Sequence, residues 1–85
     1  MEIVYLPKAS EDLKYWKKSG QKQIQIRILS ILQSIQQSPF EGIGKPEPLK
    51  HNFTGMWSRR INNVHRIIYE IKNDEIHIHS LKDHY

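Results

Sequence analysis

The sequence has no cysteine, and its 85 residues include only four glycines and four prolines. Without cysteine, neither a disulfide scaffold nor thiolate chemistry is available to the chain. No apolar run approaches the about 18 residues of a membrane-spanning helix, and no charged segment leads into an apolar one as in an export signal. A chain this short forms one modest core. We therefore expect a single domain over residues 1–85, located in the cytoplasm.

Apolar spacing in the first half of the chain is typical of one strand followed by two helices. The run 2–6 predicts a short buried strand, which Pro7 ends. Apolar residues at helical spacing predict a helix over about residues 8–19, with Gly20 as its left-handed stop. A second apolar stripe predicts a helix over about residues 21–37, which would pack on a sheet.

The second half begins with a loop over residues 40–48, after which the apolar period falls to two. This alternation predicts an antiparallel meander with strands at 49–53, 56–61, 64–72 and 75–81 and tight turns at 54–55, 62–63 and 73–74. Arg66 alternates with apolar neighbours, so its side chain should point away from the helices. We expect an α+β fold in which two N-terminal helices pack on one face of a twisted, mainly antiparallel sheet.

Positive charge is concentrated between Lys45 and Arg66. Five lysines and arginines lie in this region with a single acid, Glu47, so the region carries the whole formal net charge of +4. A polyanion would bind at such a cluster, which indicates a phosphodiester as the partner. Among the basic residues of this region, we expect Lys45 to contact RNA.

Three side chains could supply the acid, the base and the cation that RNA cleavage without a metal ion needs. Glu47 lies between two prolines, Arg66 lies within a strand and His84 lies next to Tyr85 at the end of the sequence. Cleavage needs a base for the 2′-hydroxyl proton, a cation for the phosphoryl oxygens and an acid for the departing 5′-oxygen. Ordinary pKa values of about 4.3 for Glu and about 6.5 for His suit the base and the acid. Arginine is always charged and forked to match phosphate, and Tyr85 could stack on a base.

The residues alone leave other interpretations open. Each candidate could be an ordinary surface residue, with His84 and Tyr85 forming a frayed tail. Five histidines invite a metal site, but no His-Glu-x-x-His or cysteine spacing accompanies them, so we expect neither a metal nor another cofactor. A basic module that blocks translation by binding RNA or the ribosome without cutting would also explain the charge. So would a surface that binds a partner protein.

Five motifs spread along the chain match one family pattern. They are Pro-Phe-Glu-Gly at 39–42, Gly-Lys-Pro-Glu-Pro-Leu-Lys-His-Asn at 44–52, Gly-x-Trp-Ser-Arg-Arg-Ile at 55–61, His-Arg-x-x-Tyr at 65–69 and His-Tyr at 84–85. Together they closely resemble the YoeB/Txe toxins of the RelE superfamily over essentially the full length. The resemblance implies a microbial RNase-like fold and a bacterial toxin that cuts mRNA in the ribosomal A site. It also implies neutralisation by a YefM-type antitoxin and a frequently dimeric toxin.

The same resemblance implies roles for individual residues. Glu47 matches the family's general base, Arg66 its phosphate-stabilising arginine and His84 its general acid. Tyr85 matches the terminal tyrosine that helps to organise substrate. Two further residues match basic positions expected near RNA, Lys50 and Arg59.

Asp83 is a departure from the family pattern, because members often have an aromatic residue before the terminal His-Tyr. A neighbouring carboxylate favours the imidazolium form of His84, which a general acid could use. The same carboxylate also places negative charge near RNA. The N-terminal half of the chain matches the family in pattern more than in identity.

Overall fold

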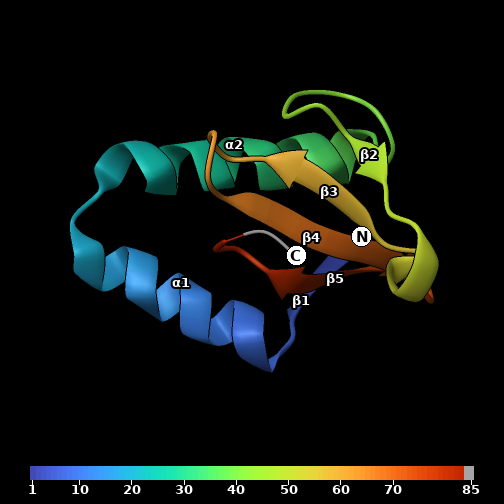
Figure 1. Cartoon of the computed structure of the whole chain (residues 1–85), viewed down its shortest axis with the longest axis horizontal. Coiled ribbons are helices and arrows are strands. Elements are labelled where there is room, and N and C mark those ends of the chain that lie inside the picture. Colours follow the sequence, from blue (N-terminus) through green and yellow to red (C-terminus); the bar gives the residue numbers. More distant parts are fainter. Residues whose placement is uncertain (84–85) are drawn as a thin grey trace.

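The computed structural model describes residues 1–83 as two helices and five strands (Figure 1). In chain order these are β1 (Glu2–Tyr5), α1 (Pro7–Ser19), α2 (Lys22–Gln37), β2 (Glu47–Pro48), a short 3-10 turn (His51–Phe53), β3 (Trp57–Arg60), β4 (Arg66–Lys72) and β5 (Glu75–Ser80). The predicted α+β class and both predicted helices are confirmed. Within residues 1–83, neither helix combines the length and hydrophobicity needed to span a lipid bilayer.

The strands form one sheet in the order β1-β5-β4-β3-β2. The pairs β2–β3, β3–β4 and β4–β5 are antiparallel, whereas β1 runs parallel to β5 with Glu2 opposite Glu75. The prediction of a mainly antiparallel sheet is therefore confirmed. The first strand of the chain lies beside the last one, because α1 and α2 carry the chain across the sheet before the meander begins (Figure 1).

Local sequence sets the helix ends. Pro7 occupies the first turn of α1, where its missing N–H costs nothing. Gly20 follows α1 with φ 72°, a left-handed conformation that glycine adopts without a steric penalty. The link to α2 is short, and the two helices diverge from it (Figure 1).

The core lies between the helices and one face of the sheet. Ile31 and Ile35 of α2 are completely buried, as are Ile67 and Tyr69 of β4. Burying one such side chain contributes about 1.5–3 kcal/mol. Because side chains alternate along a strand, Arg66 points to the opposite face, as predicted.

One predicted strand is wrong. Residues 49–53 form no strand, and His51–Phe53 is a 3-10 turn. The Thr54 hydroxyl donates to the His51 carbonyl at 2.7 Å and its backbone N–H donates there at 3.1 Å. These local bonds, with His51 at φ 59°, replace ladder bonds. The strand that pairs with β3 lies earlier, at Glu47–Pro48, where a loop was predicted.

The remaining strands of the meander are confirmed as β3, β4 and β5, each shorter than predicted. The turn at Asn73 and Asp74 is also confirmed, and both residues have positive φ, at 53° and 61°. Two successive positive φ values are typical of the tight hairpin turn that matches strand twist.

Candidate active site

Glu47 lies on the edge strand β2, where it pairs with Ser58 of β3. Prolines on both sides restrict the backbone around the carboxylate. An edge strand tolerates them, because a missing N–H there removes no bond from an outer neighbour. The sequence therefore presents an exposed glutamate on a short, stiff segment that is attached to the sheet through β3 alone.

Register places Glu47 and Arg66 on the same face of the sheet. Glu47 is opposite Ser58, and Ser58 is in turn opposite Ile68 of β4. Arg66 lies two residues before Ile68, so it shares that face. Glu47 and Arg66 are separated by two strand spacings across the sheet and by two residues along a strand. Their Cα atoms are therefore roughly 12 Å apart. Long side chains at that separation can flank one phosphodiester.

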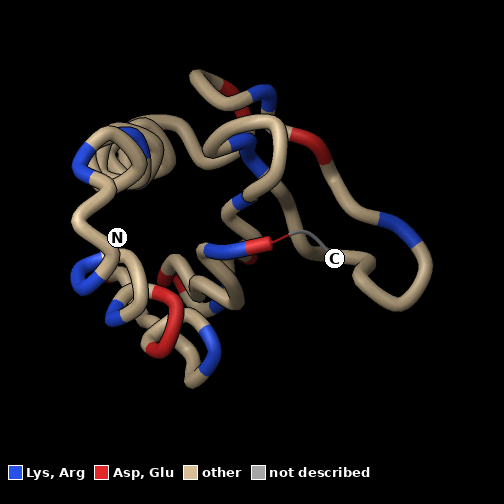
Figure 2. Tube along the Cα trace, turned by 60° about the vertical axis from the view of Figure 1, so that its left-hand side comes forward, with Lys and Arg blue, Asp and Glu red and all other residues tan. Residues whose placement is uncertain are grey.

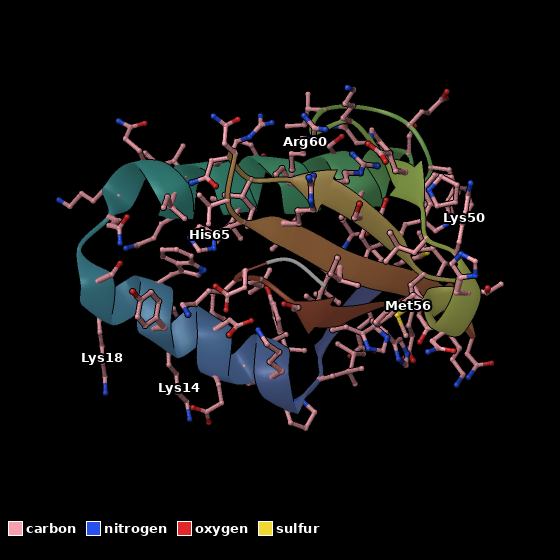
Figure 3. The ribbon with its side chains drawn as sticks, in the orientation of Figure 1. Lys14, Lys18, Lys50, Met56, Arg60 and His65 are labelled. Carbon is pink, nitrogen blue, oxygen red and sulfur yellow. The ribbon has the colours of Figure 1, made fainter. Side chains whose placement is uncertain are left out.

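Four cationic side chains surround this face. Arg60 is directly opposite Arg66, while Lys45 and Lys50 are exposed on the segments before and after β2. Figure 3 shows Lys50 beyond the end of β2 and Arg60 on β3. Lys and Arg also occur on both helices (Figure 2), but acidic residues balance the basic ones outside residues 45–66, so the net positive charge lies in the predicted cluster.

The start of β4 also holds the last described residue. The Arg66 N–H donates to the Asp83 carbonyl at 3.0 Å, and the Asp83 N–H donates to Nδ1 of His65 at 2.7 Å. The Asp83 carboxylate lies 3.4 Å from Nζ of Lys82. The predicted acid His84 and the predicted Tyr85 lie outside the described residues.

Arg59, which the sequence predicts to contact RNA, does not lie on the open face. Its side chain is completely buried on the helix side of the sheet. The guanidinium donates at 2.7–3.2 Å to five oxygens: Tyr69 Oη, Ser34 Oγ and the carbonyls of Ile43, Ser38 and Glu41. Hydrogen bonds to a charged group contribute about 1.5–3 kcal/mol each. Arg59 therefore anchors the loop that leads to Glu47.

Tyr69 and two glycines complete this anchor. Burial raises the pKa of the Tyr69 phenol above its ordinary value, and Arg59 offsets part of that increase. The neutral hydroxyl donates to the Pro39 carbonyl at 2.7 Å. Gly44, at φ 84°, packs so closely that a Cβ would lie 3.0 Å from Cβ of Arg59. At Gly42 a Cβ would collide with the Ser34 hydroxyl. Glycine is needed at both positions for this packing.

Two strand histidines face acids. Nε2 of His77 lies 3.0 Å from Glu75, and Nε2 of His79 lies 2.9 Å from Glu70. Among residues 1–83, no three histidine, aspartate or glutamate side chains form a group suited to holding a metal ion. Each of these histidines therefore belongs to a local pair with a glutamate.

The sequence and the fold of this chain match those of one protein family. The family described as the YoeB-like toxin of the bacterial type II toxin–antitoxin system matches residues 5–85. The chain belongs to this YoeB-like family. A YoeB toxin from Escherichia coli O6:H1 is 40% identical over 85 residues, which is 100% of both chains.

Solved YoeB structures have the same RelE-type fold. A YoeB/ParE toxin from Agrobacterium tumefaciens, 30% identical, superposes with a TM-score of 0.95 and full coverage of both chains. A YoeB dimer from Staphylococcus aureus is 44% identical, with a TM-score of 0.90 over 100% of this chain and 98% of that one. A heterotetrameric YoeB–YefM complex from the same organism gives 0.89 at equal identity and coverage. The chain is therefore a toxin of the type II toxin–antitoxin class with a RelE-like fold.

Sequence reasoning missed the anchoring role of Arg59. The signal was present in the alternation itself, because Trp57 and Ile61 are apolar and Arg59 lies between them at the same period. That pattern places Arg59 on the core face. The contact between His65 and Asp83 had no comparable signal, since the two residues are far apart in the sequence.

Proposed function

We propose that this YoeB-family toxin is a ribosome-dependent endoribonuclease that cuts mRNA in the A site and thereby inhibits translation in the bacterial cytoplasm. The observation that carries the proposal is the hydrogen bond from the Arg66 N–H to the Asp83 carbonyl. It holds the residue before His84 at the start of β4, and Arg66 of β4 shares the open face of the sheet with Glu47 of β2. Ribosome dependence rests on the family resemblance.

Each proposed catalytic residue has one task in the cleavage step. Glu47 takes the proton of the 2′-hydroxyl, whose oxygen then bonds to the adjacent phosphorus. Arg66 stabilises the negative charge that grows on the phosphoryl oxygens. The bond from phosphorus to the 5′-oxygen breaks, and His84 donates a proton to that oxygen. The products are a 2′,3′-cyclic phosphate and a 5′-hydroxyl, and Tyr85 would position the substrate.

The basic residues of the open face would position the message. Lys45 and Lys50 lie on either side of β2, within reach of phosphates next to the one that Arg66 contacts. Arg60, opposite Arg66, supplies a further cation. Phosphate contacts of this kind fix the position of the RNA and do not by themselves read its sequence.

We also propose a YefM-type antitoxin as the neutralising partner and a homodimer as an accessible assembly, since related YoeB toxins form both. An acidic antitoxin segment that folds on the basic face would exclude RNA from Glu47 and Arg66. Association with such a segment should slow as salt rises.

The test of the proposed function is to induce the wild type and Glu47→Gln in growing bacteria and to map new mRNA 5′ ends. We expect the variant to lose cutting by a factor on the order of 10²–10⁴ while it keeps its fold and its ribosome binding. Glu41→Gln is the matched control, because Glu41 is an exposed glutamate in the preceding loop whose described contact is made by its backbone.

Two outcomes would contradict the proposal. Wild-type cutting by Glu47→Gln would remove this carboxylate from the mechanism. Translation arrest by the wild type without new 5′ ends would favour the module that binds RNA or the ribosome and blocks translation without cleavage.

A further inference from the structure

We propose that His65 is a positioning residue for the nuclease site: by accepting the N–H of Asp83, its Nδ1 atom fixes the point at which the chain enters His84. This inference rests on the proposed function, because it concerns delivery of the proposed general acid. His65 itself does not touch the reacting atoms in this proposal. Its effect on cleavage would come through the backbone of Asp83.

Both backbone hydrogen-bonding groups of Asp83 are held by the start of β4. Its N–H donates to Nδ1 of His65 at 2.7 Å, and its carbonyl accepts from the Arg66 N–H at 3.0 Å. Asp83 has φ 64°, a left-handed conformation that non-glycine residues rarely adopt. External bonds are needed to maintain a conformation of this kind. Two bonds from adjacent residues supply them here.

The backbone and the ring of His65 are both held by contacts other than the one with Asp83. The Asn62 side-chain oxygen accepts the His65 N–H at 2.8 Å, and the His65 carbonyl accepts the Ile61 N–H at 3.0 Å. The ring packs edge-on against Trp16, with centroids 4.9 Å apart and planes at 82°. Figure 3 shows His65 next to the start of β4. With its backbone held by two hydrogen bonds and its ring packed on Trp16, His65 can direct Nδ1 at one backbone N–H.

A second contact holds the chain two residues earlier and has a different character. The Leu81 N–H donates to the Asp12 carboxylate at 2.9 Å, and Nε1 of Trp16 donates to the Leu81 carbonyl at 2.8 Å. Leu81 is completely buried, so these bonds belong to the core of the fold. Asp83 is exposed. The His65 bond therefore orients the segment beyond the core, which makes its effect on the site separable from its effect on stability.

The hydrogen bond that Nδ1 of His65 accepts specifies where the neutral ring carries its proton. Nδ1 can accept the Asp83 N–H only when that nitrogen carries no proton, so the neutral ring carries its proton on Nε2. The Asp83 carboxylate lies 3.9 Å from the same nitrogen. NMR can test this proton position directly, because the chemical shifts of the ring nitrogens distinguish a protonated from an unprotonated Nδ1.

The experiment compares two variants, one of which keeps the hydrogen-bond acceptor of His65 and the other its ring. His65→Asn keeps an acceptor near the position of Nδ1 but loses the ring. His65→Phe keeps a ring against Trp16 but has no acceptor. Each is measured for kcat and KM in ribosome-dependent cleavage, for urea unfolding, and for hydrogen exchange of the Asp83 amide. His65→Leu repeats the loss of the acceptor with a smaller side chain in case His65→Phe does not fold.

We expect His65→Asn to cut within about threefold of the wild-type kcat. His65→Phe and His65→Leu should lose about tenfold to a hundredfold in kcat with little change in KM, since small displacements of a catalytic group are costly. Asp83 amide exchange should accelerate in the same two variants but not in His65→Asn. The wild-type ring should show an unprotonated Nδ1.

Several results would overturn the inference. Wild-type cutting by His65→Phe would do so even if Asp83 exchange accelerates, and the proposed function would then still stand. Equal losses in His65→Asn and His65→Phe, in proportion to lost stability, would reduce His65 to a packing residue. Normal Asp83 exchange in His65→Phe would refute the contact. Absence of cutting by the wild type is a different failure, because it refutes the proposed function while the exchange data still test the contact.

Discussion

Arg60 and Arg66 lie directly opposite each other on β3 and β4, on the sheet face away from the helices. Among the described residues, neither guanidinium forms an ion pair with a carboxylate. Like charges in directly opposed positions destabilise a sheet. The free toxin therefore keeps two cations together that a bound phosphate would neutralise.

The first prediction concerns this pair. Arg60→Gln should raise the free energy of unfolding at low ionic strength by about 0.2–1 kcal/mol, because it removes the repulsion. The gain should shrink in high salt, which screens exposed charges. Urea unfolding at two salt concentrations measures both effects. Lys14→Gln is the control, since Lys14 lies near Glu11 on α1 and should give no gain. A salt-independent result for Arg60→Gln would mean that the two charges do not interact.

The second prediction separates two neighbouring arginines. Arg59→Met should lower the free energy of unfolding by about 3–5 kcal/mol, because it leaves buried oxygens without their donor. Arg60→Met, on the adjacent exposed residue, should not lower it and should instead give the small gain of about 0.2–1 kcal/mol expected from loss of the repulsion with Arg66. Urea midpoints of the two variants provide the measurement. Equal midpoints would show that the loop does not depend on Arg59.

The third prediction concerns the last two residues. Deleting His84 and Tyr85 should abolish mRNA cutting without unfolding the toxin, since the chain ends normally tolerate loss and the described core closes at Leu81. New mRNA 5′ ends and urea unfolding are the two readouts. His84→Gln, which keeps the chain length, is the companion variant. Full cutting by the shortened chain would mean that His84 and Tyr85 have no role in cleavage and form the frayed tail considered in the sequence analysis.

The fourth prediction tests the chemistry of the cut. A message with one 2′-deoxy sugar just upstream of the cleavage position should bind but stay intact, because the nucleophile is missing and the phosphates are unchanged. The normal message should yield a 2′,3′-cyclic phosphate, or the 3′-phosphate from its opening, and a 5′-hydroxyl. Chelation of transition metals at constant Mg²⁺ should leave the rate unchanged. Cutting of the deoxy message, or 5′-phosphate ends, would indicate activated water as the nucleophile.

Sequence predicted the parts of the fold that are determined locally. Gly20 and the pair Asn73 and Asp74 were placed correctly because a left-handed backbone restricts which residues can occupy it. The prediction of a strand at 49–53 was wrong because local hydrogen bonds competed with strand pairing. The alternation in this segment suggested a strand, but Thr54 offered the His51 carbonyl a nearer partner than any neighbouring strand.

The site was only partly predictable. Motif resemblance selected Glu47 and Arg66, and register then placed both on the open face. The same resemblance assigned Arg59 to RNA, because a motif records residue type and not the direction of a side chain. Contacts such as His65 with Asp83 join positions that no local pattern connects. The structure was needed to find them.

The parallel pairing of β1 with β5 has a consequence for how the toxin is made. Strand β1 leaves the ribosome first, yet its hydrogen-bonding partners lie on β5, at residues 75–78. The hydrogen-bond acceptor of the Trp16 side chain, the Leu81 carbonyl, is likewise synthesised late. Since chains emerge at about 5–20 residues per second, the early segments spend seconds without their partners. The parallel β1–β5 pair and the bond from Trp16 to Leu81 therefore form only after β5 and Leu81 have been synthesised.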